Sequence, residues 1–351
     1  MTTTAAPKVR TAPGSNAPVP TPQRIMELTW GYAAPLILEA AIKVGVFDAL
    51  DEGPKDLAAL SAATSASRRG LRAICDALVG FQFLSRDDSG HYALTDEAAL
   101  YLVSHKPTFQ GFLLKHISTQ LIPRWLGLEE YVRTGEPAAP VNEESEGEEF
   151  FASFVADLFP LSAPAANVLA EALQISAAAS PVNVLDIAAG SGVWGITLAK
   201  HSPLVHVTAV DWPGVLHITR SFAERHGVAD RLTTREGDIL EVDLPGNHFH
   251  VATLGHILHS EGEARSRKLL KRMFDVLAPG GTIAIAEFVV DDDRRGPAGP
   301  LIFAVNMLVN TQEGDTFSFA EISGWLAECG FVHVRQLDAP GPSPLILATK
   351  P

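Results

Sequence analysis

Cysteine and positive charge are both scarce in this chain of 351 residues. The two cysteines, Cys75 and Cys329, lie far apart and fit neither a metal-binding nor a redox spacing, so we expect a reduced, cytoplasmic protein. Lysine and arginine together number 27 against 41 aspartates and glutamates, which gives a formal net charge of −14. This acidic balance disfavours nucleic acid or an anionic membrane as the main partner.

Long apolar runs are also lacking. Residues 1–21 are rich in Thr, Ala and Pro and have no apolar core of the kind that a signal peptide requires, so we predict a disordered tail there. We expect that no later run is apolar and long enough to span a bilayer. The sequence therefore predicts a soluble, intracellular protein with two domains and a large buried core.

Residues 22–105 show the pattern of a small helical domain. Apolar residues recur at helical spacing over 23–50, and two shorter helical segments follow at 56–60 and 68–78. A turn of Asp, Ser and Gly then separates two short apolar segments, which predicts a β-hairpin within 81–94. Two helices followed by a hairpin are the arrangement of a winged helix, and we predict that this domain serves dimerisation.

A winged helix often binds DNA, and three arginines, Arg68, Arg69 and Arg72, lie on the candidate recognition helix. Acidic residues lie close by at Asp76 and Asp87, and the surrounding domain is not basic. Dimerisation is therefore the favoured role. A DNA-binding or scaffold protein that has lost turnover is the alternative from a different class.

Residues 106–175 carry further helical patterns on both sides of a polar, Pro- and Glu-rich segment at 135–149. We predict a helical linker that covers a substrate site. Phe154 and Phe159 belong to a group of phenylalanines that is denser than a surface helix requires, which indicates either core or the aromatic wall of a pocket.

A strand, a glycine-rich turn and a helix follow. Residues 182–187 form an apolar run typical of a strand that is buried on both faces. Gly190 and Gly192 interrupt the run, and a helical pattern resumes at once. Because glycine lets the backbone and a ligand approach closely, this corner is typical of nucleotide binding.

Two acids help to decide which nucleotide binds there. Gly190, Gly192 and Gly195 satisfy the G-x-G-x-x-G spacing of dinucleotide-binding enzymes. However, a carboxylate at Asp186, near the end of the strand, would repel a pyrophosphate and attract the ammonium and sulfonium groups of S-adenosylmethionine (SAM). Asp211, which ends the next strand, suits ribose hydroxyls in either case. The residues therefore favour SAM over NAD.

From 176 to 351 strands and helices alternate. Repeated βα units predict a parallel, doubly wound, Rossmann-like α/β sheet with its ligand at the carboxyl ends of the strands. Segments 331–337 and 344–349 come without a helix between them, so they should pair as a hairpin at the edge of the sheet.

Several short motifs occur in order along this part of the chain. They are Asp186-x-x-x-Gly190-x-Gly192, Asp211-Trp212-Pro213, Gly237-Asp238, the segment 254–259 and the segment 277–281. Together with the winged helix, this order resembles the small-molecule O-methyltransferases of the caffeate and hydroxyindole type, including bacterial members that modify secondary metabolites. The resemblance extends from about residue 23 onward and implies the class I SAM methyltransferase fold.

The resemblance implies roles in cofactor binding for single residues. Asp186, Gly190 and Gly192 would bind the methionine part of SAM, and Asp211 would bind its ribose. Trp212 would pack on the adenine, Asp238 and Ile239 would contact its edge, and Gly237 and Gly255 would complete the cofactor site. The product would be S-adenosylhomocysteine (SAH), and no metal is required.

For catalysis, the resemblance implies that His259 is the general base and that Glu287, after the fifth strand, orients it. A phenol with a pKa of about 10 must lose its proton near the transition state, and a histidine with a pKa of about 6.5 can accept it. A neighbouring carboxylate fixes the histidine tautomer and stabilises the imidazolium. A second acid of the family falls at Thr316 here, with Asp315 beside it.

A small, aromatic acceptor would bind between the sheet edge and helices around 112–125, 151–159 and 303–310. Its predicted contacts are Phe154, Phe159, His256, Phe303, Met307 and Asn310. The Asp-Trp pair that follows the family's histidine is Ser260-Glu261 here, which leaves C- or N-methylation, or a non-methylating use of SAM, as alternatives. We expect a homodimer, because the apolar N-terminal helix needs a partner.

Overall fold

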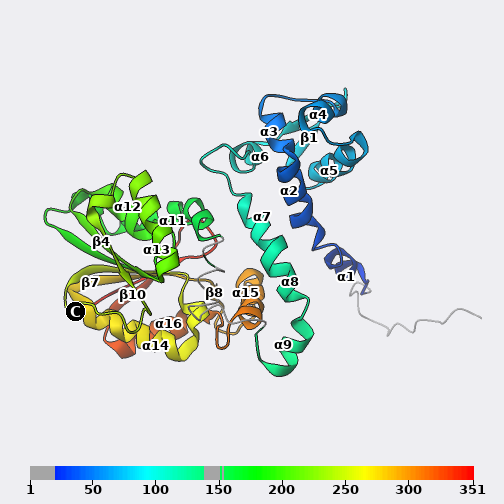
Figure 1. The fold of residues 1–351 in the computed structure, drawn as a ribbon. Coiled ribbons are helices and arrows are strands. Elements are labelled where there is room, and N and C mark those ends of the chain that lie inside the picture. Colours follow the sequence, from blue (N-terminus) through cyan, green and yellow to red (C-terminus); the bar gives the residue numbers. More distant parts are fainter. Residues whose placement is uncertain (1–19, 138–150, 152–153) are drawn as a thin grey trace, which may run out of the picture.

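The computed structural model describes residues 20–137, 151 and 154–351 (Figure 1). A small helical domain and a larger domain with a central sheet lie apart, and a run of helices connects them. The predicted tail, except for residues 20 and 21, and most of the acidic segment at 135–149 lie outside the described residues. The architecture is that of the predicted fold class.

The N-terminal domain is built from short helices and one hairpin. Its elements are α2 (Ala33–Val44), α3 (Val46–Asp51), α4 (Leu57–Thr64), α5 (Arg68–Gly80), β1 (Leu84–Arg86), β2 (Tyr92–Leu94) and α6 (Asp96–Tyr101). Asp56 caps α4 and Ser67 caps α5, because each side chain accepts a hydrogen bond from the backbone N–H three residues later. Phe47, Leu60 and Tyr92 are fully buried in the core of this domain.

The order of two helices and a hairpin is as predicted, with one shift. The first strand begins at Leu84 and not at Phe81, and it pairs antiparallel with β2. The preceding residues end α5 instead: Gln82 has a φ of 64°, and the backbone N–H of Phe83 donates to Leu78. A left-handed residue of this kind closes the last turn of a helix, and the apolar pattern of the sequence does not reveal it.

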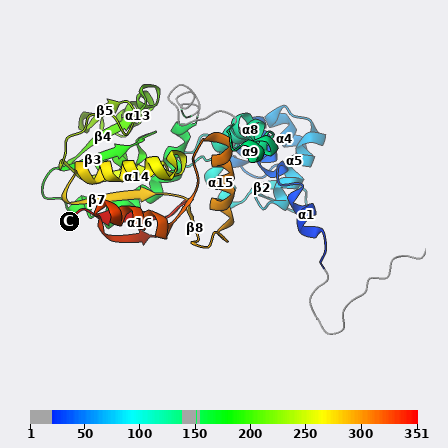
Figure 2. The ribbon, with the colours of Figure 1, turned by 90° about the horizontal axis from the view of Figure 1, so that it is seen from below.

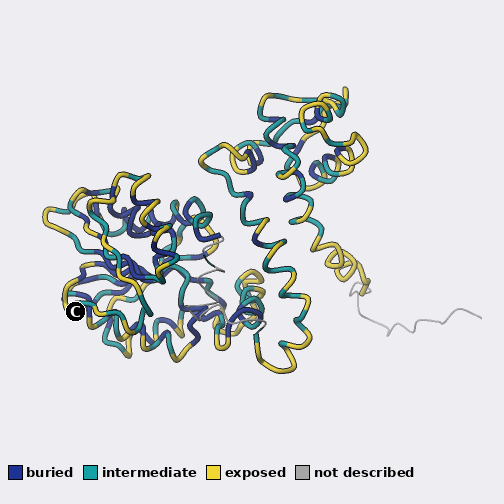
Figure 3. Tube along the Cα trace, in the orientation of Figure 1, coloured by how far each residue is buried: buried dark blue, intermediate teal, exposed yellow. Residues whose placement is uncertain are grey.

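The helix α1 (Gln23–Leu28) precedes α2, and all of its residues are exposed within the described part of the chain (Figure 3). Leu28 is 75% exposed and Trp30 is 67% exposed. Within the described residues, the stretch Gln23–Val44 is long and apolar enough to cross a membrane, which corrects the prediction that no run would qualify. One such stretch near the N-terminus is weak evidence for a membrane span, and Ala41 of this stretch belongs to the domain core.

A helical connector joins the two domains. It consists of α7 (Phe112–His116), the π-helical turn η1 (Ile117–Leu121), α8 (Ile122–Trp125) and α9 (Leu128–Thr134). Figures 1 and 2 both place α15 (Ala298–Asn310) between this connector and the sheet. Arg124 Nη1 donates to Asn310 Oδ1 (2.9 Å), and Trp125 Nε1 donates to Asn306 Oδ1 (3.0 Å). These side chains fix the connector against α15.

The larger domain contains a seven-stranded sheet with the order β10-β11-β7-β6-β3-β4-β5. The strands are β3 (Val182–Ile187), β4 (Val205–Asp211), β5 (Leu232–Glu236), β6 (Phe249–Gly255), β7 (Leu277–Ala286), β10 (Val332–Leu337) and β11 (Leu345–Thr349). Strands β3 to β7 are parallel, and β11 runs antiparallel to β7. The last two strands form the predicted hairpin, with β10 at the edge.

Helices cover both faces of this sheet (Figure 1). The helices α11 (Leu158–Ala172), α12 (Val193–His201) and α13 (Pro213–Arg225) lie on one face, and α14 (Leu258–Val276) and α16 (Phe319–Cys329) lie on the other. Short 3-10 turns, η2 (Val155–Asp157), η3 (Ile175–Ala177) and η4 (Ala229–Arg231), lie between these elements. Along β3, Val184 packs toward α12 while Leu185 and Ile187 pack toward α14, as expected for a strand buried on both faces.

Two segments at the carboxyl end of the sheet depart from what the apolar pattern of the sequence predicts, which is a helix over 265–277 and one strand over 282–290. The helix α14 begins earlier, at Leu258, and it is broken at Gly262, whose φ of 69° and ψ of 173° are not helical. The apolar segment 282–290 is not one strand, because β7 ends at Ala286 and β8 (Val289–Val290) pairs with β9 (Phe317–Ser318) in a separate ladder. Both irregular segments lie beside the cavity described next.

Candidate active site

A cavity of about 850 Å³ lies at the carboxyl ends of the parallel strands. Residues that follow β3, β4, β5 and β6 form one part of its wall, and residues of α7, η1 and α15 form another. The predicted site residues in this wall are Phe154, Gly190, Asp211, Trp212, Gly237, Asp238, Ile239, Gly255, His256, His259, Phe303, Met307 and Asn310. One continuous space therefore joins the predicted cofactor site to the predicted acceptor site.

The turn after β3 depends on Gly190 and Asp211. Gly190 has a φ of 58°, and a Cβ at this position would lie 3.0 Å from a methyl carbon of Val155. The backbone N–H of Gly190 donates to Asp211 Oδ2 (2.8 Å), and that of Trp212 donates to Asp211 Oδ1 (2.8 Å). Burial raises the pKa of Asp211 to about 6, and the two N–H groups oppose this rise. The carboxylate is thus held in the cavity wall, where it can accept further hydrogen bonds from hydroxyl groups.

Asp186 lies beneath the turn and does not face the cavity. Its carboxyl group is fully buried, where the backbone N–H of Gly195 donates to Oδ2 (2.9 Å) and Thr253 Oγ1 donates to Oδ1 (2.7 Å). Burial raises the pKa of Asp186 to about 7. The expected direct attraction between this carboxylate and the SAM cation is therefore corrected. Asp186 instead links β3, which precedes the turn, to α12, which follows it, and to the neighbouring strand β6.

Gly192 and Gly255 have different surroundings. Gly192 precedes α12 with a φ of 75°, and an added Cβ would meet Thr219 at 2.8 Å, so this glycine supports the turn from outside the cavity wall. Gly255 does line the cavity. A Cβ there would lie 1.9 Å from Nε1 of Trp194, so only glycine allows the indole to occupy its observed position.

Two charged residues that the sequence did not assign also line the cavity. Arg265 Nε donates to Glu261 Oε2 (2.6 Å), and Arg265 Nη2 donates to Asp238 Oδ2 (3.1 Å). An acid and an arginine four residues apart on one helix could have indicated the first pair. The second pair could not be expected, because Asp238 follows a different strand.

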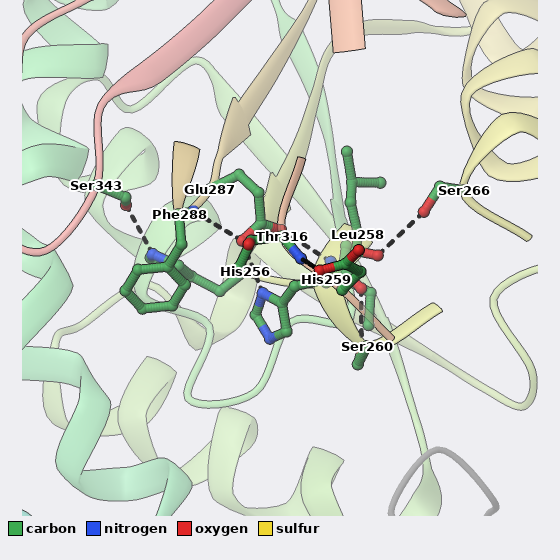
Figure 4. Close-up of polar contacts among 11 residues, drawn as sticks. His256, Leu258, His259, Ser260, Ser266, Glu287, Phe288, Thr316 and Ser343 are labelled. Atoms are coloured by element: carbon green, nitrogen blue, oxygen red, sulfur yellow. Dashed lines mark hydrogen bonds and ion pairs between the residues drawn. The ribbon is translucent and has the colours of Figure 1, made fainter. Parts of the chain in front are cut away.

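His259 and Glu287 form a buried pair at the end of β7 (Figure 4). His259 Nδ1 donates to Glu287 Oε1 (2.7 Å), and the backbone N–H of Phe288 donates to the same oxygen (2.8 Å). Burial on its own would raise the pKa of Glu287, but the adjacent His259 and the Phe288 N–H bring the pKa below its ordinary value. The side chain of Glu287 is fully buried, whereas the imidazole of His259 reaches the cavity wall. This pair is the one that the sequence predicted.

Asp315 and Thr316 do not supply a second acid to the pair. The carboxylate of Asp315 accepts hydrogen bonds from Arg294 (3.1 Å) at the surface, and only its backbone N–H contacts His259, at the carbonyl oxygen (2.9 Å). Thr316 is fully buried, and its Oγ1 has no hydrogen-bond partner in the described part of the chain. Neither side chain lines the cavity. The structure therefore does not place Asp315 at the site.

His256 is a second histidine in the cavity wall. Its backbone has a φ of 60°, and its Nε2 lies 2.7 Å from Ser343 Oγ, a partner that the sequence did not indicate. Burial lowers the pKa of His256 to about 4, so this imidazole is neutral near pH 7. The ring of Phe288 lies beside both histidines, with centroids 5.1 Å from His256 and 5.8 Å from His259.

Aromatic and amide side chains surround the rest of the cavity. The ring of Phe303 meets that of His259 edge to face at 4.9 Å, and Phe154 stacks on His116 at 4.0 Å. Phe159 does not line the cavity, because its ring stacks on Phe222 (4.8 Å) within the core. The prediction that Phe159 contacts the acceptor is therefore corrected. Among the residues that the structure describes, no group of three or more His, Cys, Asp or Glu side chains could hold a metal ion.

Two family models match this chain. Residues 146–332 match an O-methyltransferase domain, and residues 26–104 match an O-methyltransferase dimerisation domain. The chain belongs to the O-methyltransferase family. This match confirms the predicted family and supports a homodimer, and it favours O-methylation over the C-, N- and non-methylating alternatives.

Two relatives of this O-methyltransferase extend over nearly the whole chain. The 3-hydroxy-5-methyl-1-naphthoate 3-O-methyltransferase of Streptomyces sahachiroi is 32% identical, over 94% of this chain and 95% of that protein. The acetylserotonin O-methyltransferase of Bos taurus is 31% identical, over 93% of this chain and 97% of that protein.

The cofactor is indicated by a similar solved structure. Human N-acetylserotonin methyltransferase in complex with SAM matches this O-methyltransferase with a TM-score of 0.78 and 26% identity, over 96% of this chain and 99% of the other. The enzyme is thus a SAM-dependent O-methyltransferase with a helical dimerisation domain and a class I α/β domain, as predicted.

Proposed function

We propose that this enzyme methylates a phenolic hydroxyl of an aromatic secondary metabolite, with His259 as general base. The observation that carries the proposal is the position of the His259–Glu287 pair in the wall of a cavity that also contains the turn residues Gly190 and Asp211. A methyl donor held at the turn and a hydroxyl beside His259 would share one enclosed space.

The tautomer of His259 suits a general base. Because Nδ1 donates its hydrogen to Glu287 Oε1, the lone pair of the neutral ring is on Nε2, which is free to accept a proton from a hydroxyl. A phenol has a pKa of about 10, so proton transfer to an imidazole in the transition state lowers the barrier to attack. The buried carboxylate of Glu287 then stabilises the imidazolium that forms.

The residues at the other end of the cavity fit SAM, which when bound supplies a methyl group activated on a sulfonium. Asp211 offers a fixed carboxylate to the ribose hydroxyls, and Trp212 offers an aromatic surface to the adenine. Gly190 keeps the wall open where a larger residue would meet Val155. The work of the chain is then mainly alignment, because an in-line displacement requires the acceptor oxygen to lie on the axis of the breaking bond.

The acceptor end of the cavity fits a flat, largely apolar molecule. Phe154, Phe303 and Met307 supply apolar surface, while Asn306 and Asn310 supply a few polar groups, a composition typical of small-molecule sites. The named relatives act on a naphthoate and on acetylserotonin, both aromatic. These similarities support an aromatic hydroxyl as the acceptor.

The test uses SAM with a deuterated methyl group and a panel of naphthols, hydroxyindoles and polycyclic phenols, with products identified by mass spectrometry and NMR. Wild type should add the labelled methyl to an oxygen. His259→Ala should lower turnover by about 10²- to 10⁴-fold while the calorimetric Kd of SAH stays unchanged. Wild-type turnover by His259→Ala, or a product methylated on carbon or nitrogen, would overturn the proposal.

A further inference from the structure

The cavity wall carries a chain of three charged side chains. It begins at Glu261, whose side chain is 6% exposed, continues through Arg265 and ends at Asp238, each of which is more than a third exposed. All three line the same cavity as Asp211 and His259. Through Arg265, the buried Glu261 is therefore linked to Asp238, which lies at the exposed surface of the cavity wall.

The position of Glu261 is fixed by the break in α14. Gly262 has backbone angles that L side chains rarely adopt, and an added Cβ would lie 2.5 Å from the carbonyl oxygen of Glu313. The backbone is thus packed tightly immediately after Glu261. Arg265 lies one turn later, where its Nε donates to Glu261 (2.6 Å). A charged hydrogen bond with one partner buried restricts the rotation of the guanidinium.

Asp238 is held from two directions. The backbone N–H of Leu240 donates to Oδ1 (2.7 Å), and Arg265 Nη2 donates to Oδ2 (3.1 Å). An ionised carboxylate has about four acceptor positions, so this carboxylate can still accept hydrogen bonds from a ligand. It can donate none. A ligand atom that faces it must therefore carry a hydrogen, and an acceptor at that point would be repelled.

We propose that Arg265 is a positioning residue for the cofactor, oriented by Glu261 so that it holds the Asp238 carboxylate toward the 6-amino group of adenine. The inference rests on the proposed placement of SAM and on the resemblance, which assigns Asp238 to the adenine edge, and it adds the role of Arg265. The consequence is selectivity for the purine edge, because replacing the amino group by an oxo group turns a donor that faces Asp238 into an acceptor. A site built around a polar partner discriminates strongly against a ligand that leaves that partner unpaired.

The experiment compares the calorimetric Kd of SAH with that of S-inosylhomocysteine, which carries a 6-oxo group. Wild type should prefer SAH by about 10- to 100-fold. Arg265→Ala should reduce the preference to less than about 3-fold, because the carboxylate is then held at one oxygen only, by the N–H of Leu240, and can turn away from the amino group. Asp238→Ala should also remove the preference. The double variant Asp238→Ala/Arg265→Ala should then show the same preference as Asp238→Ala alone.

Arg267→Ala is the matched control. Arg267 lies on the same helix but pairs with Glu263 and Glu328, outside the cavity wall, so its removal should leave the preference at the wild-type value. Arg265→Lys should retain part of the preference, because it keeps the charge without the planar fork. If Arg265→Ala fails to fold, Glu261→Gln replaces it and should give an intermediate preference.

The outcomes separate this inference from the proposed function. An equal loss of affinity for both ligands in Arg265→Ala would show that Arg265 only supports the fold, and it would overturn the inference. Equal affinity of wild type for both ligands would also overturn the inference, because Asp238 would then not contact the amino group. A wild type that binds neither ligand would instead remove the cofactor placement on which both proposals rest.

Discussion

Glu287 uses both of its carboxylate oxygens on one residue, His259. Oε1 accepts from the imidazole Nδ1 (2.7 Å), and Oε2 accepts from the backbone N–H of His259 (3.2 Å). The acid thus fixes the position of the residue as well as the direction of its ring. A base held at two points needs little rearrangement to meet an acceptor hydroxyl.

Glu287→Gln should lower kcat/KM by about 10- to 100-fold, because the neutral amide stabilises an imidazolium less than a carboxylate does. The affinity for SAH should stay within about twofold of wild type, since Glu287 does not line the cavity. Steady-state kinetics with calorimetry measure both quantities. Glu263→Gln, which alters an exposed pair with Arg267, is the control and should leave kinetics unchanged. Unchanged kinetics in Glu287→Gln would remove this residue from the catalytic pair.

Asp211→Ala should raise the Kd of SAH by at least about 100-fold. The substitution removes the expected acceptor for the ribose and also frees the N–H groups of Gly190 and Trp212, so the turn loses its shape. Isothermal titration calorimetry measures the effect. Asp230→Ala removes an acid that is 79% exposed and should bind SAH normally. Tight binding by Asp211→Ala would contradict the assignment of the turn as the cofactor site.

The buried carboxyl group of Asp186 should make stability depend on pH. Its folded-state pKa is about 7 against an unfolded value of 3.8, so between these values the folded protein holds a proton that the unfolded chain has lost. Rising pH through this window therefore lowers the free energy of unfolding. Because other groups also titrate, the useful quantity is the difference between wild type and Asp186→Asn. The free energy of unfolding of wild type minus that of Asp186→Asn should fall from pH 4 to pH 7 by up to about 1.4 kcal/mol per pH unit. Urea unfolding measures both free energies, and a difference that does not change with pH would contradict the raised pKa.

Gly255→Ala should destabilise the protein by about 1–3 kcal/mol, since the new methyl group would overlap Trp194 and force the indole to move. The same substitution at Gly299, in α15, meets no atom within 4 Å and should stay within about 1 kcal/mol of wild type or stabilise it through helix propensity. Urea unfolding of both variants makes the comparison. Equal stabilities would mean that the contact between Gly255 and Trp194 relaxes without cost.

Light scattering should give a mass of twice the 37.5 kDa of one chain. The exposed side chains of Leu28 and Trp30 lie at the start of the matched dimerisation domain, and apolar surface of this kind is normally covered by a partner. Replacing both by Asp should yield a folded species of one chain mass. Val332→Asp, on the edge strand β10, is the control and should remain dimeric. A monomeric wild type would contradict the expectation.

The parts of the site that the sequence predicted are those fixed by chain order. Residues at the carboxyl ends of neighbouring parallel strands meet in space, so chain order predicts that Gly190 and Asp211 lie together, whereas the place of His259 comes from the family resemblance. The helical domain and the final hairpin followed from local patterns in the same way. These features depend on the backbone path and on little else.

At the site, what the sequence did not predict concerns the placement of single side chains. Asp186 alternates with Ile187 along β3, so its carboxyl group points under the turn and not into the cavity. Phe159 faces the core because α11 presents that side to Phe222. The contact between Arg265 and Asp238 depends on the break at Gly262, which the helical pattern does not reveal. Each of these depends on contacts between elements that are distant in the sequence.

The two ends of the cavity are formed by different parts of the fold. The end assigned to the methyl donor is part of the sheet itself, whereas the acceptor end includes the connector, attached to α15 through Arg124 and Trp125. A change of side-chain size at Leu113 or Ile117 would alter the shape of the acceptor end of the cavity without moving the ends of the strands. With the two ends built separately, substitutions in the connector can change which acceptor binds while the site of the methyl donor stays the same.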